Sequence, residues 1–408
     1  MRHGMSQRTE AEGSLGATSR DGSNAAPPEE ESDEEPRFFQ DPKRIAITIA
    51  SVVVIIAAIY FLFPAIVGVE DGIEKLDDGE PTWIAIALAF GFVMFAANIT
   101  LFKGIVGGNV LRLTWRESYQ INMAGLAASR LFSAGGAGGI VLTYWALRKA
   151  GMPRQQSAAR MVSLLVLMYS VYLLALLIGG ILLRTGVLDG PNPPGLTIVP
   201  AAIAGGVLLL LILVTLVPGD LQRRLARSSP DTFFGRLGVR LATVPATVST
   251  STRMALEIVR NPRRGWLAVA GAIGFWAANI AIMWASFEAF GLDVAGAVVV
   301  QGFFVGMAAN LIPGAPGGVG TVDAGMIGTY VLFGLDGSTV FASVLMYRLI
   351  AFWLPLPPGI VAFFQLRRTI AHWQEEGKPS ERTTGEGVLP PERELLASAK
   401  ASKSEVSS

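Results

Sequence analysis

The sequence predicts an all-helical integral membrane protein with an inverted repeat. Hydrophobic residues make up 51% of the 408 residues and charged residues only 16%, whereas soluble proteins carry roughly 25% charged residues. Six apolar segments are long enough to cross a bilayer, which needs about 20 residues each. Two further apolar stretches are interrupted by glycine-rich runs. We therefore expect six full spans and two opposed re-entrant helical hairpins, about eight membrane-embedded segments in all.

The six spans follow from uninterrupted apolar runs, and the two hairpins from runs that glycine breaks. Lipid cannot hydrogen-bond bare backbone, so irregular chain at membrane depth must be buried in protein or line a wet cavity. The expected spans are Ile45–Val69, Thr82–Phe102, Met161–Leu183, Leu196–Val217, Gly265–Phe290 and Thr339–Phe364, and the broken stretches are Glu117–Leu147 and Val294–Phe333.

Lysine and arginine concentrate in one set of connections, which predicts the orientation. The opposite set contains only Lys75 and Arg184, beside the acidic run Glu70–Glu80. We therefore expect a plasma-membrane protein with both termini in the cytoplasm. The basic set consists of Arg37, Lys43, Arg44, Lys103, Arg112, Arg116, Arg148, Lys149, Arg154, the stretch Arg223–Arg264, Arg367 and Arg368.

The two broken stretches then enter from opposite sides. The first lies between Arg116 and Arg148, so it enters from the cytoplasm, and the second lies between Asp293 and Asp336, on the outer side. The sequence also repeats weakly at an offset of about 180 residues, where Gly138 aligns with Gly318. Opposed hairpins with weak self-similarity are typical of inverted-topology transporters. The alternative is that each broken stretch forms two short spans.

Three regions follow from the composition. Residues 1–40 are polar and acidic and are expected to be a disordered tail. Residues 41–370 form the transmembrane domain, in which 220–264 is a basic cytoplasmic loop with an interfacial helix or, alternatively, an ordinary positive-inside loop. Residues 371–408 form a polar cytoplasmic tail.

Charged residues within the membrane indicate the candidate site. An arginine at the centre of a span costs about 2.5 to 3.5 kcal/mol on insertion scales, so it usually faces a partner or a cavity. Arg348 lies mid-span, while Arg130 and Asp323 lie at the bends of the two hairpins. If the bends meet, two arginines outnumber one carboxylate, and this excess favours an anion. Guanidinium groups bind phosphate bidentately, and glycine N–H groups can form a nest for its oxygens. A buried Arg–Asp pair that only joins the hairpins is the structural alternative.

The candidate substrate-binding residues are Arg130, Gly135, Gly136, Gly138, Gly139, Asn310, Pro313, Gly317, Gly318, Asp323, Tyr347 and Arg348. We expect no catalytic residue, metal site or cofactor, and therefore no enzyme. Cysteine is absent and the only histidines, His3 and His372, lie in the polar ends, so the usual ligands and bases are missing from the membrane. The run Gly317–Gly320 lacks the lysine of a P-loop, so nucleotide binding is not expected, and nothing indicates nucleic acid.

These motifs resemble the flippase-like transmembrane domain of lysylphosphatidylglycerol synthetases of the multiple peptide resistance factor type and its stand-alone relatives. The resemblance covers about residues 45–370. It rests on Asn310–Gly320 with the carboxylate Asp323, and on Leu345–Pro355, with Ser133–Gly139 as the first-half counterpart. Many relatives have glutamate where this chain has Asp323. Many also have a Pro-x-x-x-Gly-Glu pattern in the first hairpin, where this chain has Ser133 and, after Gly139, Ile140.

The resemblance implies a multi-pass protein that moves a phospholipid or lipid-linked group between leaflets. An anionic phospholipid is the expected partner. A homo-oligomer is a further possible assembly. The cytoplasmic aminoacyl-transferring domain of the fused synthetases is absent from this sequence, so lysine transfer is not expected. The alternatives are an ion-coupled transporter of a small anionic solute and a non-transporting membrane partner of an envelope or lipid-modifying enzyme.

Overall fold

The structure is a computed structural model that describes residue 50 and residues 78–107, 113–131, 137–216, 252–257, 259–260, 262–311 and 318–375. Within these ranges the secondary structure is helical, without strands. The expected span Ile45–Val69 apart from residue 50, the N-terminal tail, most of the 220–264 loop and nearly all of the C-terminal tail lie outside the described residues.

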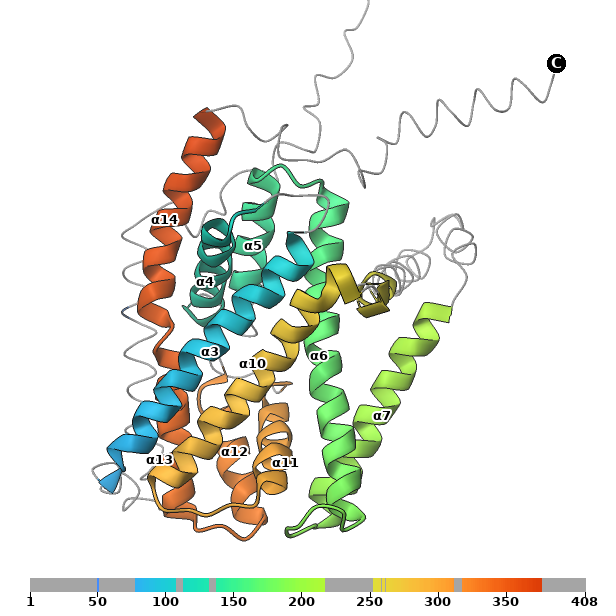
Figure 1. The fold of residues 1–408 in the computed structure, drawn as a ribbon, viewed down its shortest axis with the longest axis vertical. Coiled ribbons are helices and arrows are strands. Elements are labelled where there is room, and N and C mark those ends of the chain that lie inside the picture. The colour runs from blue at the N-terminus through green and yellow to red at the C-terminus, as the bar shows by residue number, and fades with distance from the viewer. Residues whose placement is uncertain are drawn as a thin grey trace, which may run out of the picture. The chain divides into compact units, whose positions relative to one another are not determined.

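Ten helices and two irregular helical turns make up most of the fold of the described residues, and residues 252–257 and 259–260 are also helical (Figure 1). In chain order they are α3 (Pro81–Val106), α4 (Trp115–Leu131), α5 (Ala137–Lys149), α6 (Arg154–Arg184), α7 (Pro194–Leu216), α10 (Pro262–Ala289), α11 (Gly296–Met307), a 3₁₀ turn (Ala308–Leu311), α12 (Thr321–Leu332), α13 (Gly337–Arg348), a π-helical turn (Leu349–Trp353) and α14 (Leu356–Glu375).

Five helical segments are long and apolar enough to cross a membrane. They are Pro81–Val106, Arg154–Arg184, Pro194–Leu213, Gly265–Ala289 and Gly337–Glu375. Each coincides with one of the six spans expected from the sequence, so the all-helical membrane class is confirmed. The last segment differs from the expected continuous helix, because the π-helical turn divides it into α13 and α14.

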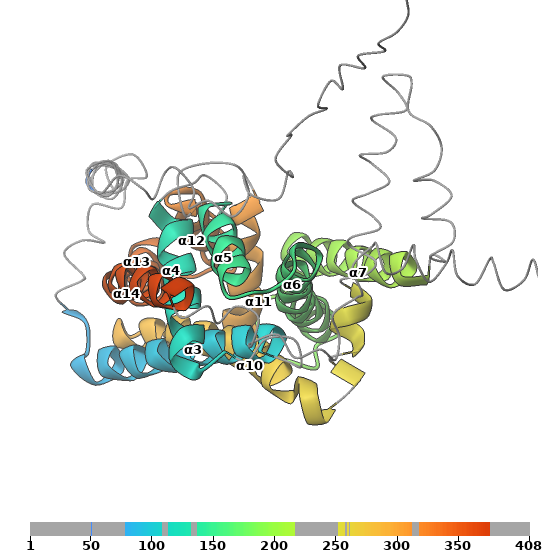
Figure 2. The same ribbon diagram turned by 90° about the horizontal axis from the view of Figure 1, so that it is seen from above.

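The closest helix pair is α3 with α10, which lie side by side in both views (Figures 1 and 2). A Cβ atom on Gly271 would lie 2.4 Å from the backbone nitrogen of Leu101, and a Cβ on Gly104 would lie 2.4 Å from that of Ala268. Small residues allow this backbone approach, which supplies much of the packing energy between membrane helices. The glycines therefore fix the scaffold on which the other helices pack.

Replacing Gly271 with leucine should destabilise the protein by about 1–3 kcal/mol or more, because overpacking forces backbone shifts. The matched control is Gly206→Leu on α7, since a Cβ there has no neighbour within 4 Å. Thermal unfolding in detergent should show a lower midpoint for Gly271→Leu alone. Equal midpoints for the two variants would contradict the close α3–α10 packing.

The two glycine-broken stretches each fold as a pair of contacting helices. Helix α4 packs on α5 and α11 packs on α12. Figure 1 shows the first pair in the upper part of the view and the second pair in the lower part. The upper pair also packs against α14, so helices from both halves of the sequence meet.

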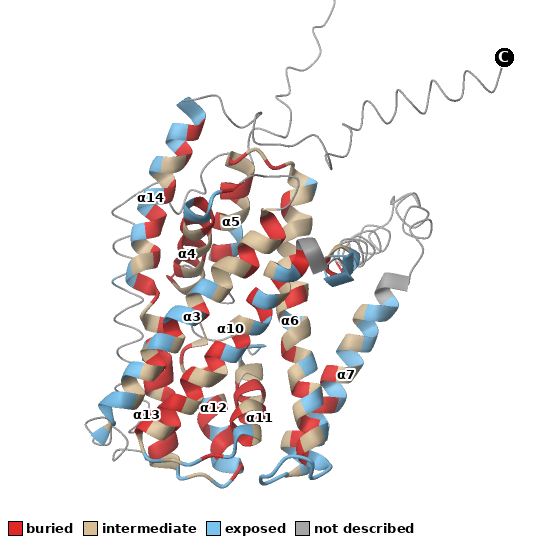
Figure 3. Ribbon diagram, in the orientation of Figure 1, coloured by how far each residue is buried: buried red, intermediate tan, exposed pale blue. Residues whose placement is uncertain are grey.

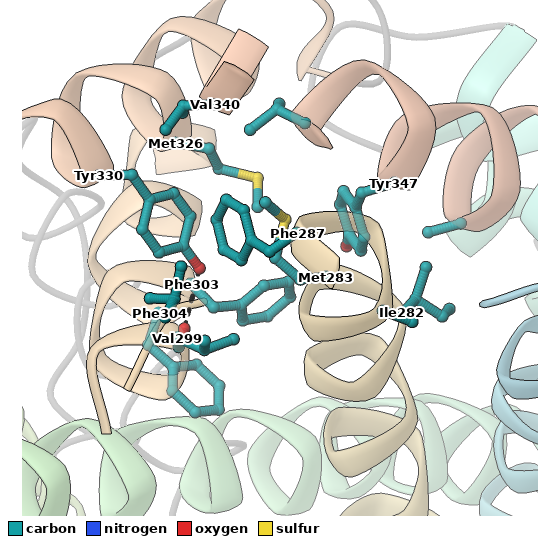
Figure 4. Packing of buried hydrophobic residues seen from close by; sticks show 14 of the residues in the cluster. Ile282, Met283, Phe287, Val299, Phe303, Phe304, Met326, Tyr330, Val340 and Tyr347 are labelled. Atoms are coloured by element: carbon teal, nitrogen blue, oxygen red, sulfur yellow. Dashed lines mark hydrogen bonds between the residues drawn. The ribbon is translucent and has the colours of Figure 1, made fainter. Parts of the chain in front are cut away.

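An aromatic core holds the lower pair in place. Phe287 of α10, Phe303 of α11 and Tyr330 of α12 are fully buried, and Figure 4 shows them packed with Tyr347 of α13. The Tyr330 hydroxyl donates to the carbonyl of Val299 at 2.8 Å. Burial is dense on α12 and α13 and sparse on α7 (Figure 3). The end of α13 is therefore held rigidly next to the break between α11 and α12.

Candidate functional site

The candidate site lies where the end of α4, the break between α11 and α12, and the π-helical turn after α13 come together. These elements line a cavity of about 490 Å³. Its polar and charged lining consists of Asn98, Ser129, Arg130, Tyr169, Asn279, Asn310, Tyr347 and Arg348. The rest of the lining is glycine or apolar side chains. The cavity therefore combines a few polar groups with an apolar wall, as small-ligand sites commonly do.

Arg348, the last residue of α13, is paired with a carboxylate. Its Nε donates to Asp323, and both side chains are 7% exposed. Its Nη2 donates to the carbonyl of Gly318 at 3.0 Å. The other carboxylate oxygen of Asp323 accepts from the N–H of Gly320 at 2.8 Å. Asp323 therefore caps the start of α12, where the helix dipole also favours negative charge.

The turn before α12 needs glycine for its backbone. Gly318 and Gly320 have φ angles of +68° and +82°, a region that residues with a Cβ rarely adopt. This conformation turns the Gly318 carbonyl toward Arg348 and the Gly320 N–H toward Asp323. The glycine run thus builds the frame of the ion pair, in addition to any role in ligand contact.

Arg130, the penultimate residue of α4, has backbone partners. Its guanidinium donates to the carbonyls of Phe352 and of Ala351, the latter at 3.0 Å. The Ala351 carbonyl is available because prolines lack an N–H. Pro355 follows Ala351 by four residues, the α-helical spacing, so the Ala351 carbonyl has no N–H from that position. Arg130 therefore caps a helix break on a different segment of the chain.

The two guanidinium groups share one aromatic ring. The Cζ atoms of Arg130 and Arg348 lie 4.7 Å and 5.4 Å from the ring centroid of Phe352, close enough for cation–π attraction. Among the described residues, Asp323 is the carboxylate that pairs here, and none pairs with Arg130. The group of two arginines and one aspartate keeps one excess positive charge beside the cavity.

A hydrogen bond between Tyr347 of α13 and Asn279 connects the site to α10. The Tyr347 hydroxyl donates to Oδ1 of Asn279 at 2.9 Å, and both side chains are buried. Asn310, in the 3₁₀ turn, lines the cavity from an exposed position. These groups can accept or donate hydrogen bonds next to the arginines.

The structure brings most of the described candidate residues together. Arg130, Asn310, Gly318, Tyr347 and Arg348 line the cavity, and Asp323 contacts Arg348. The residues Gly135, Gly136, Pro313 and Gly317 lie outside the described residues.

Two candidate glycines of the first broken stretch lie inside a helix and are not among the residues that line the arginine cavity. Gly138 and Gly139 lie in the first turn of α5. A Cβ on Gly139 would lie 2.3 Å from the carbonyl oxygen of Gly125. Gly139 therefore permits close packing of α5 on α4, and it lines a second, smaller cavity beside the first.

Phe352 and Ser129 line the cavity but were not among the residues predicted from the sequence. Phe352 follows Arg348 by four residues, a helical spacing that places side chains on the same face, so this spacing could have revealed the ring. Ser129 precedes Arg130 directly and lines the same cavity. No sequence pattern distinguishes it from an ordinary packing serine.

Fold and site together define a multi-pass helical membrane protein with charged side chains inside the bundle. The chain belongs to the family described as the lysylphosphatidylglycerol synthase TM region, whose profile matches residues 48–359. The resemblance noted from the motifs is thereby confirmed.

Two curated relatives, both from Methanothermobacter thermautotrophicus (strain Delta H), are described as UPF0104 membrane proteins. One is 34% identical over 87 residues and the other 27% identical over 86 residues. Each alignment covers 21% of this chain and 26% of the relative, so the similarity spans about a quarter of those proteins.

Proposed function

We propose that this protein moves an anionic phospholipid, or a lipid-linked anionic group, between the leaflets of the plasma membrane, and that it is a transporter rather than an enzyme. The observation that carries the proposal is the cavity lined by Arg130 and Arg348, with one excess positive charge. Buried charge within a membrane bundle is costly and usually marks a substrate path. Guanidinium groups suit a phosphate better than ammonium groups do, because their planar fork matches two oxygens at once.

We propose that the cavity opens sideways, past two partly exposed lining residues, and such an opening favours a lipid over a water-soluble anion. Tyr169 of α6 and Ile140 of α5 line the cavity, and each is 46% exposed. Tyr169 lies midway along a 31-residue helix that can span the membrane. An opening at that height faces hydrocarbon, so a headgroup could enter there while its tails stay in the bilayer. A transporter for a free anion needs a cavity sealed from lipid instead.

The proposed topology places the site at mid-membrane. We propose that α4–α5 and α11–α12 are re-entrant hairpins of an inverted repeat, entering from the cytoplasmic and outer sides. The basic residues support this orientation: Lys103 lies in the last turn of α3, Arg148 and Lys149 lie in the last turn of α5, and α6 begins at Arg154. Figure 1 shows these helix ends on the same side of the bundle as the end of α14. With cytoplasmic basic ends, both termini are cytoplasmic.

The three charged residues take different parts in this proposal. Arg130 and Arg348 attract the phosphate, while Asp323 holds Arg348 and limits the net charge. A weak site is required, because every 1.4 kcal/mol of extra binding energy raises the affinity about tenfold, and a tightly held lipid would not leave the site. The existing partners of both arginines serve this purpose, since a phosphate must compete with them.

Reconstitution tests the proposal. Liposomes that contain the full-length protein and a leaflet-labelled anionic phospholipid should lose leaflet asymmetry faster than protein-free liposomes. The double variant Arg130→Ala with Arg348→Ala should abolish the difference. Arg184→Ala is the matched control, because Arg184 is exposed at the far end of α6.

A parallel arm with encapsulated inorganic phosphate separates the two kinds of substrate. Phosphate efflux without lipid movement would replace the proposal with a small-anion transporter. Unchanged lipid movement in the folded double variant would show that the arginines are structural only.

A further inference from the structure

A second cavity adjoins the arginine site and differs from it in chemistry. It has a volume of about 260 Å³ and lies among α3, α4, α5, α6 and α10. No charged side chain is among the described residues that line it. Most of its wall is apolar, including Phe102, Val106, Met161, Leu164 and Met168.

Two polar side chains of this second cavity, Asn122 and Ser129, have local partners. The Asn122 amide donates to the carbonyl of Asn98 at 2.9 Å, and the Ser129 hydroxyl donates to the carbonyl of Leu126 at 2.8 Å. These donors are engaged within the protein, so they offer little to a polar ligand. The two methionines add an adaptable surface, because their unbranched side chains accommodate varied apolar shapes.

The two cavities are adjacent and share part of their walls. Six residues line both of them: Asn98, Leu126, Ser129, Ile140, Leu165 and Phe275. Ser129, which lines both cavities, directly precedes Arg130 in α4, so the apolar cavity adjoins the one that contains the arginines. A ligand that fills both cavities must have an anionic end and a hydrocarbon end.

We infer that the smaller cavity binds one hydrocarbon chain of the same amphiphile whose phosphate lies at Arg130 and Arg348. The inference rests on the proposed function and narrows its substrate to a lipid, excluding a free anion. The chain extends from the arginines toward Val106 and Met161, that is, toward the end of α3 and the start of α6. One chain occupies this cavity, and a second chain stays outside the opening beside Tyr169 and Ile140.

Affinity is a poor readout for this inference, because a chain that moves from bilayer to pocket exchanges one apolar environment for another. The position of the chain is the useful observable. The full-length protein is placed in nanodiscs that contain phosphatidic acid with a photoreactive diazirine halfway along one acyl chain. After illumination, peptide mass spectrometry locates the crosslinks.

The expected result is crosslinking to inward-facing side chains of α6, namely Met161, Leu164 and Met168. Crosslinks to outward-facing side chains of the same helix, such as Ile178, serve as an internal reference for annular lipid, because Ile178 is 52% exposed. Leu164→Trp should fill the cavity and remove the inward crosslinks while the reference is kept. Leu174→Trp is the matched control, since Leu174 is 46% exposed on α6.

Wild-type crosslinks confined to outward-facing side chains would overturn the inference, and so would inward crosslinks that persist in folded Leu164→Trp. If that variant does not fold, Met161→Phe narrows the same cavity with a smaller change. The reconstituted leaflet assay keeps the two proposals separate. Lipid movement without inward crosslinks would overturn the chain site alone, whereas absence of lipid movement in the wild type would overturn the proposed function.

Discussion

Replacing Asp323 with alanine is expected to destabilise the folded protein by about 3–5 kcal/mol, because it leaves a buried guanidinium without its carboxylate. Arg348 and Asp323 are both buried, so the lost contact lies away from bulk solvent. The N–H of Gly320 also loses its acceptor. The free energy of unfolding can be measured by titrating the protein with a denaturing detergent in mixed micelles. Asp293→Ala, which removes an exposed carboxylate, should change it little.

The pair can be removed as a unit to separate stability from function. Replacing a buried ion pair with apolar residues of similar volume is often neutral or stabilising. Asp323→Leu with Arg348→Met should therefore recover most of the stability lost in Asp323→Ala. It should not recover lipid movement, since one of the two proposed phosphate-binding arginines is gone. Full lipid transport by this folded double variant would show that the Asp323–Arg348 pair only stabilises the fold and does not bind the lipid.

The all-helical membrane class and the membrane spans could be predicted from the sequence, because they follow from composition and from the length of the apolar segments. Five of the six expected spans coincide with helices that are long enough to cross a membrane, and the remaining one lies outside the described residues. Helix ends were less predictable. The break after Arg348 depends on Pro355, whose missing N–H favours a π-helical turn only when another donor satisfies the carbonyl of Ala351.

The proximity of Arg130, Asp323 and Arg348 was predictable from the free-energy cost of burying charged groups in apolar surroundings. Charged groups that are far apart in the sequence but lie within apolar stretches have few options other than meeting one another. Their individual partners were not predictable. The sequence shows that two arginines outnumber one aspartate, but the choice of Arg348 as its partner depends on how α12 and α13 pack. Likewise, no pattern around Arg130 indicates that it would bind carbonyls of the turn at Ala351 and Phe352.

These partners create an ambiguity that a single substitution cannot remove. Arg130→Met deletes the excess charge and also leaves two carbonyls without a donor, which costs about 1–3 kcal/mol for each buried group. A loss of transport in that variant could come from either cause. A second change is therefore needed that repairs the backbone without restoring the charge.

Pro355→Ala supplies part of this repair, because alanine has an N–H four residues after Ala351 that can donate to that carbonyl, and the substitution removes a helix-breaking ring; the Phe352 carbonyl still lacks the Arg130 donor. We expect Arg130→Met to slow lipid movement about 10- to 100-fold, the equivalent of a charge-assisted hydrogen bond worth about 1.5–3 kcal/mol. Adding Pro355→Ala should raise the unfolding midpoint toward that of the wild type and leave transport slow. Arg130→Lys should transport at an intermediate rate, since it keeps the charge without the planar fork. Recovery of transport in Arg130→Met with Pro355→Ala would mean that Arg130 acts only as a cap on the turn, and the anion site would then reduce to Arg348, whose charge Asp323 already balances.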